Sequence, residues 1–227
     1  MKVKDWKKYI YFFMMFGSIQ FIILTFIAML FYQGGTFNNP NIPGYSFFHN
    51  FFSDLGRVKA WSGKSNVISY VLFTIALTIF GISFLLYFIT MPYFFVERKL
   101  EKYISIIGSI LAIITGISVV GVAFTPYDVY PSAHFNFVRI AFLSLFLAMA
   151  IYAITTFLNK EYPIQYKIIF LIFSLIIGIY IIIMLSYQNI SENEILMIQA
   201  TSQKIVIYTW KISFLIESYG SWKLGKS

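Results

Sequence analysis

The chain has 227 residues, of which 59% are hydrophobic and only 11% are charged, and its mean hydropathy is +0.77. A soluble domain carries about 25% charged residues, so the composition excludes an ordinary soluble protein and indicates an integral membrane protein. There are no cysteines, which excludes disulfides, thiolate metal sites and cysteine nucleophiles. The net charge of +8 does not indicate nucleic-acid binding, because the basic residues lie mostly between apolar runs.

Six apolar segments follow one another along the chain. Each is long enough to cross a hydrocarbon core, which needs about 20 residues, so the sequence predicts an all-α, single-domain bundle of six transmembrane helices. The predicted spans are residues 9–32, 65–91, 103–124, 134–158, 167–187 and 195–222. The last segment is the most polar, and we expect it to span with Lys204, Tyr208 and Lys211 turned inward. The alternative is a helix that lies along the membrane surface.

The basic residues and the glycines predict how the spans are arranged. With the N-terminus inside, eleven lysines and arginines fall on the cytoplasmic side and three in the outer connections. This is the bias of the positive-inside rule, and an even number of spans returns the chain to the same side. We therefore expect a protein of the cell membrane with both termini cytoplasmic. Gly108, Gly116 and Gly121 in the third span would permit close helix contacts.

The first outer connection contains an amphipathic stretch, residues 44–57. Read as a helix, it places four phenylalanines and Leu55 on one face and five polar groups on the other. The polar groups are His49, Asn50, Ser53, Asp54 and Arg57. A short helix with one strongly apolar side, next to membrane spans, is typical of the bilayer interface. We therefore expect an interfacial helix that holds these groups toward water or a pocket.

The predicted topology brings both histidines and two carboxylates to the outer side. His49, Asp54, Asp128 and His134 would then share one membrane face, and imidazole and carboxylate are suitable ligands for Zn²⁺ or another divalent ion. A metal-activated water would hydrolyse an ester or amide near the lipid headgroups, with Ser53 and Asp54 as catalytic candidates. In a second version Ser53 is the nucleophile and His49 is its base.

The same residues also fit a structural interpretation. Ser53 and Asp54 precede Gly56, which is the pattern of a capped turn at a helix end. His134 opens the fourth span, where it would bond a neighbouring carbonyl. No compact signature such as HExxH supports the metal site.

Four ionisable residues lie within or at the edge of predicted spans: Arg139, Lys204, Lys211 and Glu217. A charge at the bilayer centre costs about 2.5–3.5 kcal/mol on insertion scales, so each should have a partner or a wet cavity. Asp54 or Asp128 is the expected partner of Arg139. The alternative is that Arg139, Lys204 and Lys211 bind phosphate headgroups.

Three short motifs resemble a known family. They are Ser53-Asp54-Leu55-Gly56, then Gly121-Val122-Ala123-Phe124-Thr125-Pro126 followed by His134, and Gln203-Lys204 with Trp210 beyond it. Over residues 9–222 the pattern is similar to six-span membrane proteins catalogued as domain of unknown function nine-nine-eight. It is more distantly similar to the Frag/DRAM group, some of which are linked to lipid-anchor remodelling and autophagy. The resemblance implies a six-span fold and an outer polar site, but no particular reaction.

We therefore expect a lipid- or headgroup-interacting membrane protein, with a metal-dependent hydrolase at the outer face as its enzymatic version. The competing class is non-enzymatic. It comprises a structural or scaffold subunit of a membrane complex, or a small transporter in which Arg139, Lys211 and Glu217 pair within the bundle. The expected partners are membrane lipids and, for a subunit, other membrane chains.

Overall fold

The computed structural model describes residues 5–185 and 193–225. The long helices are α1 Asp5–Phe31, α2 Val67–Thr90, α3 Lys99–Phe124, α4 Pro131–Leu158, α5 Ile164–Leu185 and α6 Asn193–Leu224. Two short 3-10 helices, η1 Phe52–Gly56 and η2 Met91–Phe94, precede and follow α2. This part of the chain contains no β-strand, only an isolated bridge between Lys59 and Ser65. The prediction of an all-helical protein is confirmed.

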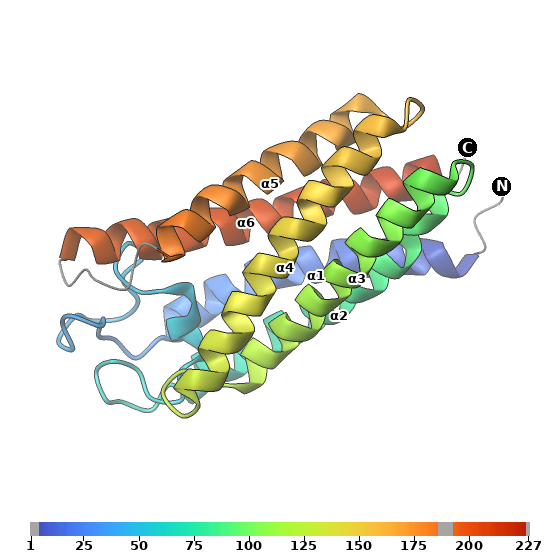
Figure 1. Ribbon diagram of the computed structural model, residues 1–227. Helices are drawn as coiled ribbons and strands as arrows, with labels where there is room; N and C mark the ends of the chain where they lie inside the picture. Colours follow the sequence, from blue (N-terminus) through green and yellow to red (C-terminus); the bar gives the residue numbers. More distant parts are fainter. Residues whose placement is uncertain (1–4, 186–192, 226–227) are drawn as a thin grey trace.

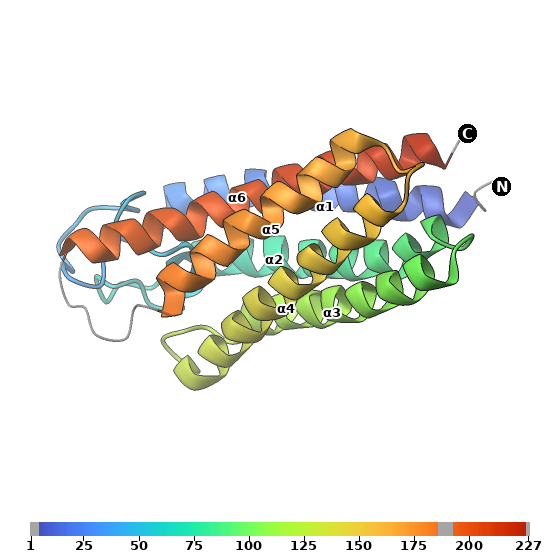
Figure 2. The same cartoon turned by 45° about the horizontal axis from the view of Figure 1, so that its top comes forward.

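The long helices run up and down and pack as a closed ring in sequence order. Each helix contacts the next one, and α6 closes the ring against α1. Figures 1 and 2 show α6 beside α1 and α5 along the length of the bundle. Residues 32–66, residues 125–130 and the first turns of α6 lie together at one end, which we call the loop end (Figure 1). The start of α1 and the end of α6 lie at the opposite, terminal end.

Glycines allow close helix contacts in the ring. A Cβ built on Gly81 of α2 would lie 2.9 Å from the carbonyl oxygen of Gly116, and one built on Gly116 would lie 2.9 Å from that of Gly81. Toward α4, a Cβ on Gly108 would lie 2.9 Å from a tyrosine ring and one on Gly121 2.5 Å from a phenylalanine ring. The prediction that the glycines of the third span permit close contacts is confirmed.

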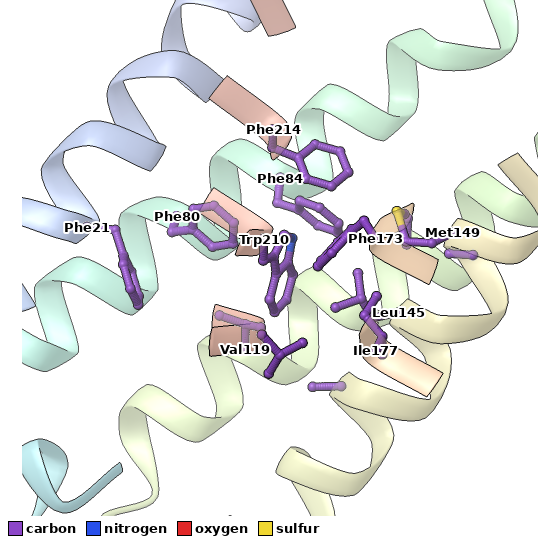
Figure 3. Packing of buried hydrophobic residues seen from close by; sticks show 14 of the residues in the cluster. Phe21, Phe80, Phe84, Val119, Leu145, Met149, Phe173, Ile177, Trp210 and Phe214 are labelled. Atoms are coloured by element: carbon purple, nitrogen blue, oxygen red, sulfur yellow. The ribbon is translucent and has the colours of Figure 1, made fainter. Parts of the chain in front are cut away.

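Aromatic side chains from α2, α5 and α6 fill the middle of the ring. Figure 3 shows Phe80 and Phe84 beside Trp210, with Phe173 and Phe214 close to them. The Trp210 ring centroid lies 5.2 Å from that of Phe80 and 5.1 Å from that of Phe84, and both pairs are nearly perpendicular. Such edge-to-face pairs contribute about 0.5–1.5 kcal/mol beyond the area that they bury. Because all five side chains are buried, they hold α6 inside the bundle.

Five helical segments are long and apolar enough to cross a membrane: α1 from Trp6, α2 continued to Phe94, α3, α4 and α5. Their outward faces expose large apolar side chains such as Phe26, Ile75 and Ile107, as lipid contact requires. The helical membrane-protein class is therefore confirmed. α6 does not join the five, because its residues are on average less apolar than those of the other long helices.

Residues 44–57 do not form the amphipathic helix that their periodicity predicts. The segment contains turns followed by the five-residue η1. Its burial is also different from the prediction, because Asn50 and Asp54 are buried whereas Phe47 and Phe48 are exposed. The physical reason is that η1 packs against α1, α2 and α6. The phenylalanines therefore take positions set by these helices and not by a 3.6-residue period.

Candidate functional site

η1 joins the first connection to α6 at the loop end. The Phe52 ring stacks on Phe21 of α1, with centroids 5.6 Å apart. The Phe52 backbone N–H donates to Oε1 of Gln203, 2.6 Å away. On the next residue of α6, Lys204 Nζ donates to the carbonyl oxygen of Asn50. Two consecutive polar side chains of α6 therefore hold the backbone of the first connection.

Asp54 organises the interior of this connection. Its side chain is buried, and its Oδ2 accepts hydrogen bonds from Nδ2 of Asn50 (3.0 Å) and from the backbone N–H of Phe51 (2.9 Å). Its Oδ1 accepts the Nε1–H of Trp61 at 3.0 Å. Burial raises the pKa of Asp54, while these hydrogen bonds and the charge of Arg57 oppose the shift. The carboxylate is therefore occupied by donors of its own connection.

Asp128 ties the third connection to the first. Its two oxygens accept the backbone N–H groups of Val58 (3.0 Å) and Lys59 (2.8 Å). The Arg57 guanidinium adds a second link, since it lies 5.5 Å from the ring centroid of Tyr127. The two connections thus form one polar layer at the loop end, as the predicted topology requires.

The four predicted metal ligands are not gathered into one site. Asp54 and Asp128 accept hydrogen bonds from the first connection, as described above. His134 Nδ1–H donates to the carbonyl oxygen of Thr125, 2.7 Å away, which is the structural alternative that the sequence allowed. Within residues 5–185 and 193–225, no three His, Asp or Glu side chains come close enough to hold a metal ion. A metal centre built from these residues and His49 is therefore not formed.

Ser53 and His49 do not form the predicted nucleophile–base pair either. His49 Nδ1 lies 3.1 Å from Oγ of Ser46. The backbone N–H of Ser46 in turn donates to Oδ1 of Asn50 at 2.8 Å. The histidine contact therefore closes a local turn, and Ser53, which is half-buried, is not part of it.

A polar cleft of about 430 Å³ lies within the first connection. Its walls are Tyr32 and Gln33, directly after α1, the turn of residues 40–44, and Ser62 with Lys64. Gly44 adopts φ +62° in this turn, a conformation that other residues rarely adopt. Pockets that bind small molecules have about 300–1,000 Å³, so the cleft has room for a small polar group. Sequence reasoning missed it, although the glycines and prolines of this stretch do indicate turns.

α6 turns three of its ionisable side chains into the bundle. Lys204, Lys211 and Glu217 are each 1% exposed, and the inward orientation of the two lysines agrees with the prediction. Lys211 Nζ lies 3.5 Å from the ring centroid of Phe80 and 4.0 Å from that of Trp210. Such cation–π contacts contribute about 2 kcal/mol or more when desolvated. Lys211 is therefore stabilised by aromatic rings, and the expected pairing with Glu217 is not formed.

Arg139 lies on the outer surface of α4. It is exposed, as are Phe135 and Leu143, which lie one turn before and after it on the same face. Asp54 and Asp128, the expected partners, are held inside the loop end. Among the described residues, Arg139 takes part in no salt bridge. The guanidinium therefore faces outward without a neutralising carboxylate.

Comparison with known proteins gives no match. No family model matches the chain, and neither the curated proteins nor the solved structures contain a match. The resemblance to the six-span family therefore stays an expectation. Functional inference rests on the loop end and on the buried face of α6.

Proposed function

We propose that the chain is a six-span membrane protein that binds phosphate-bearing lipid headgroups at its loop end, with both termini on the cytoplasmic side. Support for the sixth span comes from α6. Its 32 residues give a length of about 48 Å, more than the roughly 30 Å of a hydrocarbon core. Its outward face carries Ile198, Ile205, Ile212 and Tyr219, all exposed and seven residues apart. A lipid beside α6 would therefore meet apolar side chains, while the charges stay inside.

The observation that carries lipid binding is the unpaired Arg139 on an apolar surface. It lies eight residues from the start of α4, or about 12 Å along the helix axis. An arginine at this depth extends its stem along apolar surface and places the guanidinium at the headgroup level. There a phosphate is the natural partner, because guanidinium and phosphate form bidentate, charge-assisted hydrogen bonds.

The polar cleft gives a second place for a phosphate at the same end. Lys64 is the only cation among its lining residues, and the mostly polar lining suits a headgroup more than an acyl chain. A free phosphate compound would satisfy the same chemistry. The two sources of phosphate are separated by testing Arg139 and Lys64 independently.

We expect Arg139→Gln to weaken the binding of phosphatidylglycerol to the detergent-purified protein by about tenfold, which corresponds to about 1.4 kcal/mol. Native mass spectrometry with added lipid gives the apparent affinity. Lys160→Gln is the matched control, because Lys160 is an exposed cation at the terminal end, and its affinity should equal that of the parent. Equal lipid affinity in the Arg139→Gln and Lys160→Gln proteins would contradict the proposal. If only Lys64→Gln changes binding, and does so for glycerol phosphate as well as for lipid, the ligand is a soluble phosphate.

A further inference from the structure

η1 packs well below the loop-end limits of the helices that surround it. The ring of Phe52 contacts Phe21 of α1, with centroids 5.6 Å apart, and Phe73 of α2, with centroids 5.9 Å apart. Phe21 lies ten residues before the end of α1, and Phe73 lies six residues after the start of α2, which corresponds to about 15 Å and 9 Å along the helix axes. The chain therefore reaches the loop end after α1, turns back between the helices at Phe52 and returns to the loop end before α2.

The outward faces of α1 and α2 place this turn at membrane depth. Leu30 and Phe31 in the last turn of α1 are exposed, and so are Val67 and Ile68 at the start of α2. The apolar outer surface thus extends to the loop-end limits of both helices, beyond the level of Phe52. Non-helical backbone at such a depth is tolerated only where protein encloses it and satisfies its polar groups. This is the position of a re-entrant segment, which comprises residues 50–56.

Side chains on two sides satisfy the backbone of the re-entrant segment. Gln203 and Lys204 of α6 bond to it as described above. The carbonyl oxygen of Leu55 accepts hydrogen bonds from Nδ2 of Asn66 (3.3 Å) and from Oγ of Ser69 (3.0 Å), at the start of α2. Leu55 is itself fully buried. The segment is therefore attached to α6 on one side and to α2 on the other.

A buried cation of α6 lies beneath the tip of the re-entrant segment. The Phe21 ring that contacts Phe52 has its centroid 4.2 Å from Nζ of Lys211, so a single aromatic ring separates the lysine from the tip. Lys211 is 1% exposed, and among the described residues it takes part in no salt bridge. An ionisable side chain inside a membrane bundle typically marks the path of an ion or a substrate. The route from the loop end to Lys211 is therefore of functional interest.

We propose that the re-entrant segment is a plug that closes the loop-end approach to Lys211. The Phe52 ring also contacts Tyr208, with centroids 5.8 Å apart, and Tyr208 lies one turn before Lys211 on the same face of α6. Phe52 therefore covers the part of α6 that leads to the lysine. Water and small solutes from the loop end reach Lys211 only when this ring leaves its place. The plug does not involve Arg139, so it is independent of headgroup binding there.

Thiol reactivity at position 211 tests the plug. The chain has no cysteine, so Lys211→Cys introduces a single thiol into the purified full-length protein, and a small water-soluble methanethiosulfonate reports its access to water. We expect a slow reaction, and a reaction at least about tenfold faster when Phe52→Ala is added, because the loss of a buried phenylalanine ring lowers the cost of local opening. Phe48→Ala is the matched control. Phe48 belongs to the same connection but is 54% exposed, so its replacement should leave the rate unchanged.

A second thiol separates local opening from general loosening of the bundle. Ser109 of α3 is 5% exposed, and Ser109→Cys should react equally slowly with and without Phe52→Ala. Three results would overturn the plug: a rate at position 211 that Phe52→Ala does not change, equal acceleration at positions 211 and 109, and a Lys211→Cys protein that reacts as fast as the exposed thiol of Lys64→Cys. If Phe52→Ala does not fold, Gln203→Leu removes the acceptor of the Phe52 N–H and keeps the ring. We expect Gln203→Leu to speed the reaction at position 211 by a smaller factor, and an unchanged rate would count against the plug.

Discussion

Replacing Asp54 with alanine is expected to lower Tm by about 6–12 °C. The substitution leaves three donors without their acceptor, namely the buried side chain of Asn50, the half-buried side chain of Trp61 and the backbone N–H of the half-buried Phe51. Unsatisfied buried donors cost about 1–3 kcal/mol each, and the removal of a buried carboxylate offsets part of this. A net loss of about 3 kcal/mol corresponds to the stated shift in a chain of this size. Tryptophan fluorescence during heating measures it.

Limited trypsin digestion checks that the damage is local. The first connection contains Arg57, Lys59 and Lys64 as cleavage sites, and Asp54→Ala should be cut there faster than the parent. Ser53→Ala is the control, because it changes the adjacent half-buried residue and leaves the Asp54 hydrogen bonds in place. If Asp54→Ala melts and is digested like Ser53→Ala, the carboxylate does not organise the loop end.

Gly81→Ala is expected to lower Tm by about 2–12 °C, because the helices α2 and α3 must separate to admit the methyl group. The added Cβ would lie 2.9 Å from the carbonyl oxygen of Gly116 and 2.8 Å from a methyl group of Val120. Overpacking of this kind costs about 1–3 kcal/mol, and a backbone oxygen cannot rotate away as a side chain can. Fluorescence-detected melting of the purified protein measures the change.

Gly178→Ala is the matched control for this contact. Its added Cβ would meet only the edge of the Phe146 ring, at 3.2 Å, which can move aside. The same substitution raises intrinsic helix propensity by about 1 kcal/mol, so its Tm should equal or exceed that of the parent. If both variants melt alike, the α2–α3 contact is looser than the structure indicates.

The helices were predictable from sequence because a membrane leaves few alternatives. In hydrocarbon every backbone N–H and C=O must be satisfied within the segment, so a long apolar run such as residues 164–185 has one solution. The inward face of α6 was also predictable. Lys204 and Lys211 are seven residues apart and share one side of a helix, and burying them costs less than exposing them to lipid.

The first connection was not predictable in the same way. Its phenylalanines have helical spacing, but Phe52 is positioned by Gln203, 151 residues later in the chain. From the sequence, Asp54 was a candidate metal ligand or catalytic residue. Its structural role is seen only from the groups that donate hydrogen bonds to it, among them Trp61. Local sequence patterns do not encode which distant groups supply hydrogen bonds. The metal site and the serine–histidine pair that the residue types suggested at the loop end are therefore not formed.

The most direct test of the central claim, that α6 crosses the membrane with its charges inside the bundle, is cysteine labelling. The chain has no cysteine, so Lys64→Cys, Lys160→Cys and Lys223→Cys each introduce a single thiol at an exposed position. With a membrane-impermeant maleimide on intact cells, we predict labelling of Lys64→Cys alone, and labelling of the other two only after permeabilisation. Labelling of Lys223→Cys in intact cells would place the end of α6 outside and contradict the sixth span.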